Sequence, residues 1–422
     1  MKKKFYSVVT LACMLFYACS NELQVSPSAP GSNEEVVSSD FRSLDEAIAI
    51  ANKSVSMLGD GTRGVTDRTV DKSKVFAVKN KGTRTSSENA FNHDTLMYAI
   101  NFEDGNGYAI VSANRATEAL IAVTESGSYS PEEVSENEGL NYYMENAAKY
   151  VSSSVTKPLP FLKERDTIAS RLRSGFPLDT KWGQKNYFGR FAPNNICGCF
   201  PLAVMEIMSY YSYPTTMTLH YLGDNDSTIN INWTDIYKHK VYKETNFANH
   251  ELICSAPSEA HTYISHIARE IGYEANCTYS TNSTGTAMSN MLPCVTGFGF
   301  TNAQIKDYEP GCTTTYLSQK HPLIFLAYSS EGGHAWVVDA CIREHLTITD
   351  RSGLNIGESA RTYEVDKIYN HYNWGWNGVD NGYYLDNVFD VSEYSELDDT
   401  NYKNDNIEYN FNQGNWYLTM WP

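Results

Sequence analysis

The chain has 422 residues, which is too long for one ordinary domain and enough for two. Its formal net charge of −17 argues against nucleic acid or an anionic membrane surface as a partner. Thirty Tyr and seven Trp are too many for a disordered chain and favour aromatic-lined cores and clefts.

The first residues have the pattern of an export signal, which we place at residues 1–19. A charged stretch at residues 2–4 precedes an apolar run at 5–18 that is too short to span a bilayer. A small residue followed by Cys19 is similar to a bacterial lipoprotein cleavage site, which predicts a lipidated Cys19 at the new N-terminus. Phe16 and Tyr17 are bulkier than that motif usually carries, so plain secretion stays an alternative. Both interpretations predict an exported protein, found in the cell envelope or secreted.

Seven further Cys residues follow the signal, and they lack the dense, even spacing of a disulfide scaffold. Most are expected to be small buried side chains. No Cys-x-x-Cys pair or His cluster is present, so no structural zinc site is predicted. We expect no metal and no organic cofactor.

Residues 20–40 are rich in Ser, Pro, Asn and Glu and predict a flexible tether. A small α+β domain without obvious chemistry is expected at 41–156. It should begin with a helix capped by Ser43 and Glu46, a capping-box pair. Apolar periodicity and turn residues predict its other elements: a hairpin of strands 95–102 and 108–112, a strand at 119–124 and a helix at 140–151.

The pattern breaks at residues 157–175, where prolines and scattered basic residues predict an exposed linker that a protease could cut. An ordinary interdomain loop explains this composition equally well. The second domain is expected at 176–422. Its acidic stretch, residues 386–408, predicts a solvated loop, and the aromatic tail after it predicts a strand returning to the core.

Cys199 is the candidate nucleophile because it opens a predicted helix. Apolar residues after it recur at helical spacing as far as Tyr211, and Pro214 ends the run. A sulfur at a helix N-terminus faces unpaired N–H groups and the positive end of the dipole, which favour a thiolate. Cys197, just before Gly198, is a possible rival, but it lies outside the helix.

His334 is the candidate base. It directly follows Gly332 and Gly333 and opens an apolar strand, so its ring should be exposed and its backbone closely packed. Asn373 is the candidate for orienting the base, since its amide oxygen can accept from the imidazole, and Trp374 can shield that bond from water. Gln184, just upstream of the nucleophile, is the candidate oxyanion donor together with the Cys199 backbone N–H.

These residues and their chain order resemble the streptopain family of bacterial cysteine peptidases. The resemblance implies a papain-like α+β fold, in which the helix with the Cys packs on an antiparallel sheet with the His, preceded by an inhibitory propeptide. The similar runs in the second domain are Trp182–Gln184, Gly198–Met208, Tyr213–Pro214, Ile231–Ile236, Ile271–Tyr279, Gly332–Asp339, Asn373–Trp376 and Gly382–Tyr384. Those similar to the family's propeptide are Tyr98–Phe102 and Gly107–Ala113.

The chain departs from the family pattern at three places. Phe200 and Pro201 follow the nucleophile where the family usually has small residues, and Glu206 stands where a Gln is common. The spacing from His334 to Asn373 is longer than the family minimum, which predicts an inserted hairpin.

The sequence therefore predicts an exported cysteine endopeptidase made as a zymogen, with protein or peptide substrates and its own propeptide as an intramolecular inhibitor. A catalytically inactive surface lipoprotein that uses the fold for binding is one alternative, suggested by Phe200 and Pro201. A Cys-His transglutaminase or amidase is the other, although such enzymes commonly place an Asp where this chain has Asn373.

Overall fold

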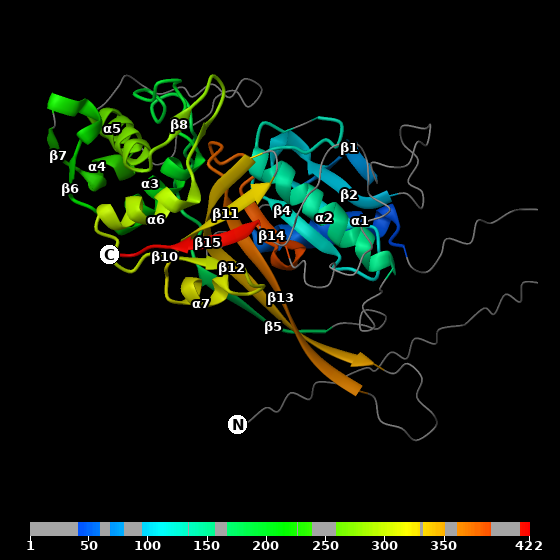
Figure 1. Ribbon diagram of the computed structural model, residues 1–422. Helices are drawn as coiled ribbons and strands as arrows, with labels where there is room; N and C mark the ends of the chain where they lie inside the picture. Colours follow the sequence, from blue (N-terminus) through cyan, green and yellow to red (C-terminus); the bar gives the residue numbers. More distant parts are fainter. Residues whose placement is uncertain are drawn as a thin grey trace, which may run out of the picture. The chain divides into compact units, whose positions relative to one another are not determined.

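The computed structural model describes residues 41–59, 68–79, 95–133, 135–156, 167–225, 227–238, 259–329, 332–350, 361–389 and 414–422 (Figure 1). The predicted signal and tether, with Cys19, lie outside these residues. Within them, no helix combines the length and the hydrophobicity needed to cross a bilayer. Ser39–Pro422 forms one compact unit. We refer to residues 41–156 as the N-terminal segment and to residues 176–422 as the C-terminal segment.

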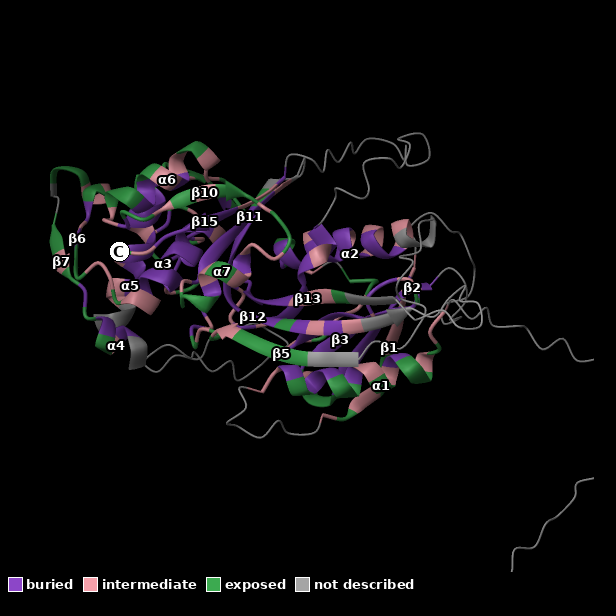
Figure 2. Ribbon diagram, turned by 90° about the horizontal axis from the view of Figure 1, so that it is seen from below, coloured by how far each residue is buried: buried purple, intermediate pink, exposed green. Residues whose placement is uncertain are grey.

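The N-terminal segment begins at the predicted capping box. The Ser43 hydroxyl accepts a hydrogen bond from the Glu46 N–H, and the Glu46 carboxylate accepts one from the Ser43 N–H. Helix α1 follows, then four antiparallel strands and helix α2, which confirms the predicted hairpin and second helix. Figure 2 shows α1 and α2 on opposite faces of β2 and β3. The bounds are α1 Leu44–Ser54, β1 Val70–Lys79, β2 Thr95–Phe102, β3 Tyr108–Ser112, β4 Leu120–Thr124 and α2 Glu138–Thr156.

One continuous sheet joins the two segments. Strand β4 of the N-terminal segment pairs antiparallel with β14 (Gly382–Leu385) of the C-terminal segment, with Val123 opposite Tyr383. Gly382 is required at this junction, because a Cβ there would collide with the Val123 carbonyl oxygen. The strand order is β1-β2-β3-β4-β14-β13-β12-β11-β15-β10, and β5 also pairs with β12.

Helix α3 (Cys199–Tyr211) is the central helix of the C-terminal segment, and its residues from Phe200 to Ser209 are all buried. It packs on β12 and on α5. The long β12–β13 hairpin, which pairs Asp350 with Arg361, confirms the predicted insertion. The remaining bounds are β5 Thr167–Gly175, β6 Thr216–Thr218, β7 Thr228–Asn230, α4 Trp233–Lys238, α5 Glu259–Glu274, β8 Thr278–Tyr279, β9 Thr284–Gly285, α6 Met288–Gly297, β10 Gln304–Asp307, α7 Thr313–Ser318, β11 Leu323–Ser329, β12 Gly332–Asp350, β13 Arg361–Asn373 and β15 Asn415–Thr419.

The two faces of β12 contact different parts of the molecule. Ala335 and Val337 belong to the apolar cluster that contains α3 and α5. Trp336 and Val338 belong to the cluster that contains α2 and strands of the N-terminal segment. This alternation follows from the period of two in a β-strand. The N-terminal segment therefore covers one face of the strand that carries His334.

Two predictions need correction. The second half of the expected linker, residues 167–175, is not irregular but forms β5, because it pairs with β12 from Thr347 to Ala340. The start of the acidic stretch is not solvated: Asp386 is fully buried in a 3₁₀ helix, Asp386–Phe389. Its carboxylate accepts hydrogen bonds from the Gly311 N–H and from Asn370 Nδ2. Residues 390–408 lie outside the described residues, and β15 confirms the returning strand.

Candidate active site

Cys199 opens α3, as the sequence predicts. The chain enters the helix at Gly198, whose φ of +96° is rare for residues with a side chain. A Cβ there would also lie 2.9 Å from Cγ2 of Thr284, so a larger residue does not fit. The Cys199 side chain is half-buried, and the backbone N–H groups of Ala335 and Phe200 are near enough to its sulfur to lower the pKa of the thiol. The sulfur thus lies between the start of α3 and strand β12.

Opposing effects act on the Cys199 thiol. Burial raises its pKa, the backbone N–H of Ala335 lowers it, and the carboxylate of Glu138 raises it further. The net result is a pKa above the ordinary thiol value. In the full-length chain, burial therefore outweighs the preference of a helix start for thiolate, and the sulfur is protonated at neutral pH.

His334 lies on β12 directly before Ala335, and its side chain is buried, so the prediction of an exposed ring is wrong. Burial lowers its pKa to about 4, although a hydrogen bond with the Trp374 backbone acts in the opposite direction. Its ring stacks on Trp336 with the centroids 6.0 Å apart, and its Nε2 has no hydrogen-bond partner. The imidazole is therefore uncharged and is not bonded to the Cys199 sulfur in this state.

The start of α2 lies at both candidate catalytic residues. Asn137 caps the helix by accepting from the Leu140 N–H, at 3.1 Å. The next residue, Glu138, is close enough to Cys199 to raise its pKa. A Cβ on Gly139 would lie 2.5 Å from Cδ2 of His334 and 2.8 Å from the Trp374 ring. The N-terminal segment thus covers the place where Cys199 and His334 lie.

Asn373 is fully buried, and its side chain bonds to groups other than His334. Its Nδ2 donates to the Thr180 carbonyl oxygen at 2.9 Å and to Glu206 Oε1 at 3.1 Å. Its Oδ1 accepts from the Gly375 N–H at 3.3 Å and from Asn381 Nδ2 at 3.2 Å. The predicted bond from the imidazole to Asn373 is therefore not formed in the full-length chain.

The other predicted residues surround this site. Gln184 is half-buried, and its carbonyl oxygen accepts from the Cys197 N–H at 2.9 Å, which fixes the loop before α3. Trp374 is 1% exposed and packs on Trp336 with ring centroids 4.9 Å apart. Gly333 lies against the Tyr328 ring, where a Cβ would come within 2.7 Å.

The rival Cys197 is a poorer candidate for the nucleophile. It is 1% exposed, and burial raises the pKa of its thiol well above the ordinary value. Its Sγ lies 3.6 Å from the Gly198 carbonyl oxygen, a contact in which the thiol donates. A fully buried thiol that donates to a carbonyl is inert, so the geometry favours Cys199.

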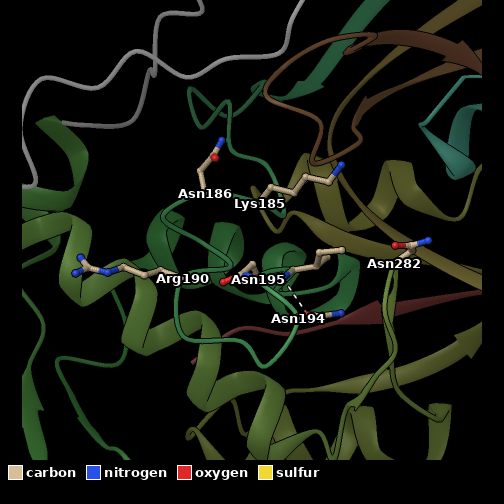
Figure 3. Close-up of a pocket in the computed structure, with 7 residues that line it drawn as sticks. Lys185, Asn186, Arg190, Asn194, Asn195 and Asn282 are labelled. Carbon is tan, nitrogen blue, oxygen red and sulfur yellow. Dashed lines mark hydrogen bonds between the residues drawn. The ribbon is translucent and has the colours of Figure 1, made fainter.

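A surface pocket of about 600 Å³ lies beside the loop that carries Gln184. In Figure 3 the side chains of Lys185 and Arg190 point away from each other at its rim. Nζ of Lys185 lies 3.7 Å from the carboxylate of Glu136, close to the start of α2, and 6.0 Å from the Trp376 ring centre. The pocket is lined by Lys185, Asn186, Arg190, Asn194, Asn195, Ile196 and Asn282.

Sequence reasoning missed an ionic cluster at the junction of the two segments, in which His371 and Asp339 are buried and Glu125 and Lys181 are partly exposed. His371 Nδ1 lies 2.6 Å from Asp339 Oδ1, and its Nε2 lies 3.4 Å from a carboxylate oxygen of Glu125 in the N-terminal segment. Lys181 Nζ reaches the second oxygen of Glu125 at 3.5 Å. These residues are far apart in the chain, and no local pattern signals that they meet.

One group among the described residues could hold a metal ion. His220, Glu270 and Glu274 place their ligand atoms within 4.8 Å of one another. His220 Nδ1 lies 3.1 Å from Glu270 Oε1 and 3.0 Å from Glu274 Oε1. A protonated imidazole between two carboxylates accounts for this arrangement without a metal ion.

Comparisons with known proteins find relatives for both segments. Residues 182–384 match the family model described as Peptidase C10 family, and residues 36–151 match that described as Spi protease inhibitor. Streptopain from Streptococcus pyogenes is 23% identical over 388 residues, covering 81% of this chain and 82% of streptopain.

A solved structure shares the fold. A fragment of prointerpain A from Prevotella intermedia matches with a TM-score of 0.51 and 19% identity, covering 82% of this chain and 97% of that one. The predicted α+β fold is thereby confirmed: a papain-like domain preceded by an inhibitor segment. Residues 182–384 are therefore the region of a C10-type cysteine peptidase similar to streptopain, and a Spi-type inhibitor segment precedes them in the chain.

Proposed function

We propose that this protein is an exported cysteine endopeptidase that is latent until its N-terminal segment is removed. Cys199 is the nucleophile and His334 the base. The observation that carries this proposal is the position of Cys199, at the start of α3 and near enough to Ala335, the residue after His334, for the Ala335 N–H to lower the pKa of its thiol. A second role follows for the start of α2, which keeps both groups uncharged and apart.

In the active enzyme, His334 takes the thiol proton and the Cys199 thiolate attacks the scissile carbonyl carbon. Gln184 and the Cys199 backbone N–H stabilise the oxyanion. The His334 imidazolium then gives its proton to the leaving amide nitrogen, the C–N bond breaks, and an acyl-thioester remains. Water, deprotonated by His334, attacks that thioester and releases the acid, and the proton returns to the sulfur.

Asn373 orients His334 in this mechanism, and Trp374 shields the bond between them. Gly198 and Gly333 let the backbone approach closely on the two sides of the site. No metal and no organic cofactor has a role in these steps. Asn373 as third member distinguishes the proposal from a transglutaminase-type acyl transfer, for which Asp is commonly the third member.

Activation requires a cut between the two segments, which we place within residues 157–175. Residues 1–19 act as the export signal, with Cys19 as the lipidated N-terminus of an envelope protein. Labelling with radioactive palmitate in a bacterial host tests the anchor. A Cys19→Ala variant that still incorporates the label would exclude lipidation at Cys19 and leave plain secretion.

The test of the catalytic proposal compares two Cys variants of the full-length chain after activation by a trace of wild-type enzyme. Cys199→Ala is expected to lose casein hydrolysis and epoxide labelling, whereas Cys197→Ala is expected to keep both. The reverse pattern would identify Cys197 as the nucleophile. If the wild type and both variants all fail to hydrolyse casein and to react with the epoxide, the result would support the binding lipoprotein. Incorporation of an added amine into casein without hydrolysis would instead indicate acyl transfer.

A further inference from the structure

Glu206 is a carboxylic acid on the buried central helix. It lies on α3, seven residues after Cys199, and is 1% exposed. Its neighbours on the helix, Met205 and Ile207, are fully buried apolar side chains. A carboxyl group in such a place costs free energy unless it is neutral or paired with a cation. Its presence therefore requires an explanation.

The groups that face Glu206 offer no positive charge. Asp339 on β12 is the charged residue that acts on it, and it is another carboxylate, already paired with His371. Asn373 on β13 and Thr180 in the loop before α3 are uncharged. Glu206 also lies near enough to Cys197 to raise the pKa of its thiol. Burial raises the pKa of Glu206 well above its ordinary value, and Asp339 adds to the shift. Its surroundings therefore favour the uncharged form of Glu206.

The hydrogen bond from Asn373 to Glu206 is one of four that fix which way that amide points. Both N–H donors of the amide are used, one on the Thr180 carbonyl oxygen and one on Glu206 Oε1. Its oxygen accepts from the Gly375 N–H and from Asn381 Nδ2. A flipped amide would bring its oxygen against the Thr180 carbonyl oxygen and its nitrogen against the Asn381 nitrogen. The oxygen is thus held on the side away from Glu206.

We propose that Glu206 is a positioning residue: by accepting from Asn373 Nδ2 it helps to hold the amide in the orientation in which its oxygen, bonded to Gly375 and Asn381 in the full-length chain, accepts from His334 in the active enzyme. This proposal rests on the proposed function, in which Asn373 orients His334. Glu206 touches no reacting atom, and its effect reaches the reaction through Asn373. Removal of the acceptor alone should therefore lower kcat and leave KM nearly unchanged, because the substrate does not contact Glu206.

The test uses the full-length chain, activated by a trace of wild-type enzyme, with kcat expressed per active site by epoxide titration. Glu206→Met keeps the unbranched shape and removes the acceptor, and should lower kcat by about three- to tenfold, the usual range for one hydrogen bond. Glu206→Gln keeps an amide oxygen at the same place and should restore kcat to within about twofold of wild type. In the Asn373→Ala background, Glu206→Met should cause no further loss of kcat.

Each other outcome overturns the proposal. A Glu206→Met variant with wild-type kcat, or one whose effect adds in full to that of Asn373→Ala, would show that Glu206 does not act through Asn373. Wild-type kcat in Asn373→Ala would refute the role of Asn373, while Cys199→Ala would still report separately on the proposed function. A Glu206→Gln variant as slow as Glu206→Met would also contradict the proposal.

A second measurement decides the case if Glu206→Met does not fold. A buried acid with a raised pKa binds a proton more tightly in the folded than in the unfolded chain, so it weakens the fold as pH rises above its ordinary value of 4.5. The melting temperature of Glu206→Gln should therefore exceed that of wild type by a margin that grows from pH 5 to pH 8. An unchanged margin would show that Glu206 is not an uncharged acid.

Discussion

Gly139 of helix α2 lies directly against the imidazole of His334. A Cβ at this position would come within 2.5 Å of Cδ2 of His334 and 2.8 Å of the Trp374 ring. Because nearly no space separates them, the smallest side chain is the one that lets α2 begin at this point. The fit of the N-terminal segment on the site therefore depends on a glycine inside a helix, where glycine is otherwise unfavourable.

Gly139→Ala should loosen the hold of the N-terminal segment, because either α2 or His334 must shift. We expect Cys199 in the full-length chain to be labelled by an epoxide inhibitor about tenfold faster than in wild type, which corresponds to a contact cost near 1.4 kcal/mol. Peptide mapping confirms which Cys is labelled. Gly297→Ala at the end of α6, where a Cβ meets open space, is the control and should label at the wild-type rate. Equal rates for both variants would contradict a tight fit at Gly139.

Glu125→Gln should weaken the junction between the segments in a way that depends on pH. Burial alone would raise the pKa of Glu125, but His371 and Lys181 lower it to about 2. Its contribution is therefore fully present above the ordinary 4.5 and is lost as pH falls towards 2. Burial alone would lower the pKa of His371, but Asp339 and Glu125 raise it to about 10, so this contribution declines as pH rises from 6.5 to 10.

The melting temperature of the full-length protein measures this effect across pH. Expressed as free energy of unfolding, the destabilisation by Glu125→Gln should be largest, at about 2 kcal/mol, between pH 4.5 and 6.5. It should be smaller at lower and at higher pH. Glu132→Gln changes an exposed residue of the same segment and should leave the profile unchanged. A difference that is constant with pH would mean that Glu125 and His371 do not form an ion pair.

Lys185→Glu should speed the activation of the full-length chain, since it turns the ion pair with Glu136 into a repulsion. Both side chains are more than half exposed, so we expect no more than about a fivefold effect, reduced at high salt. The double variant Glu136→Lys with Lys185→Glu should return to the wild-type rate. Arg190→Glu makes the same charge change in the same pocket and is the control. A similar acceleration in Arg190→Glu would mean that the net charge of the pocket, and not the Lys185–Glu136 ion pair, sets the activation rate.

Removal of the N-terminal segment should reverse the protonation of the catalytic pair. The Cys199 thiol, whose pKa is raised in the full-length chain, should ionise below the ~8.5 of a free Cys. His334, whose pKa is lowered to about 4 by burial, should become a cation that pairs with the thiolate. A plot of kcat/KM against pH for a small amide substrate should therefore have a rising and a falling limb. A single rise near the free-thiol value would contradict the pair.

The same assay ranks the two partners of the nucleophile. His334→Ala should reduce kcat/KM more than Asn373→Ala does, because in the proposed mechanism His334 is the base and Asn373 only orients it. Each variant is first checked for a wild-type melting temperature, since both residues are buried. An Asn373→Ala enzyme as slow as His334→Ala would assign Asn373 a larger role than orientation.

Local patterns predicted the elements, and non-local contacts decided the rest. The capping box at Ser43 and the helix opened by Cys199 follow from short-range spacing, so the sequence located both. Strand β5 owes its form to pairing with β12, and its basic composition suggested an exposed linker instead. Asp386 is buried because Gly311 and Asn370 supply donors that no acidic run reveals.

The sequence predicted which residues form the candidate site, but not their burial, charge state or contacts. Chain order and a family resemblance identified Cys199, His334, Asn373 and Gln184. Cys199 and His334 are uncharged because they are buried beneath the start of α2. This burial comes from contacts with residues about 60 and 195 positions away in the chain, which spacing alone does not reveal. Glu206 was recognised in the sequence as a departure from the family pattern, and its contact with Asn373 became visible only in the fold.

The pairing of β4 with β14 has a consequence for the activated enzyme. In the full-length chain, Gly382, Tyr383 and Tyr384 lie opposite Thr124, Val123 and Ala122 in an antiparallel ladder. Departure of the N-terminal segment strips this ladder and leaves β14 as a bare sheet edge with unsatisfied N–H and C=O groups. Such an edge can pair with another extended chain, so activation also exposes a surface for β-sheet pairing with other chains.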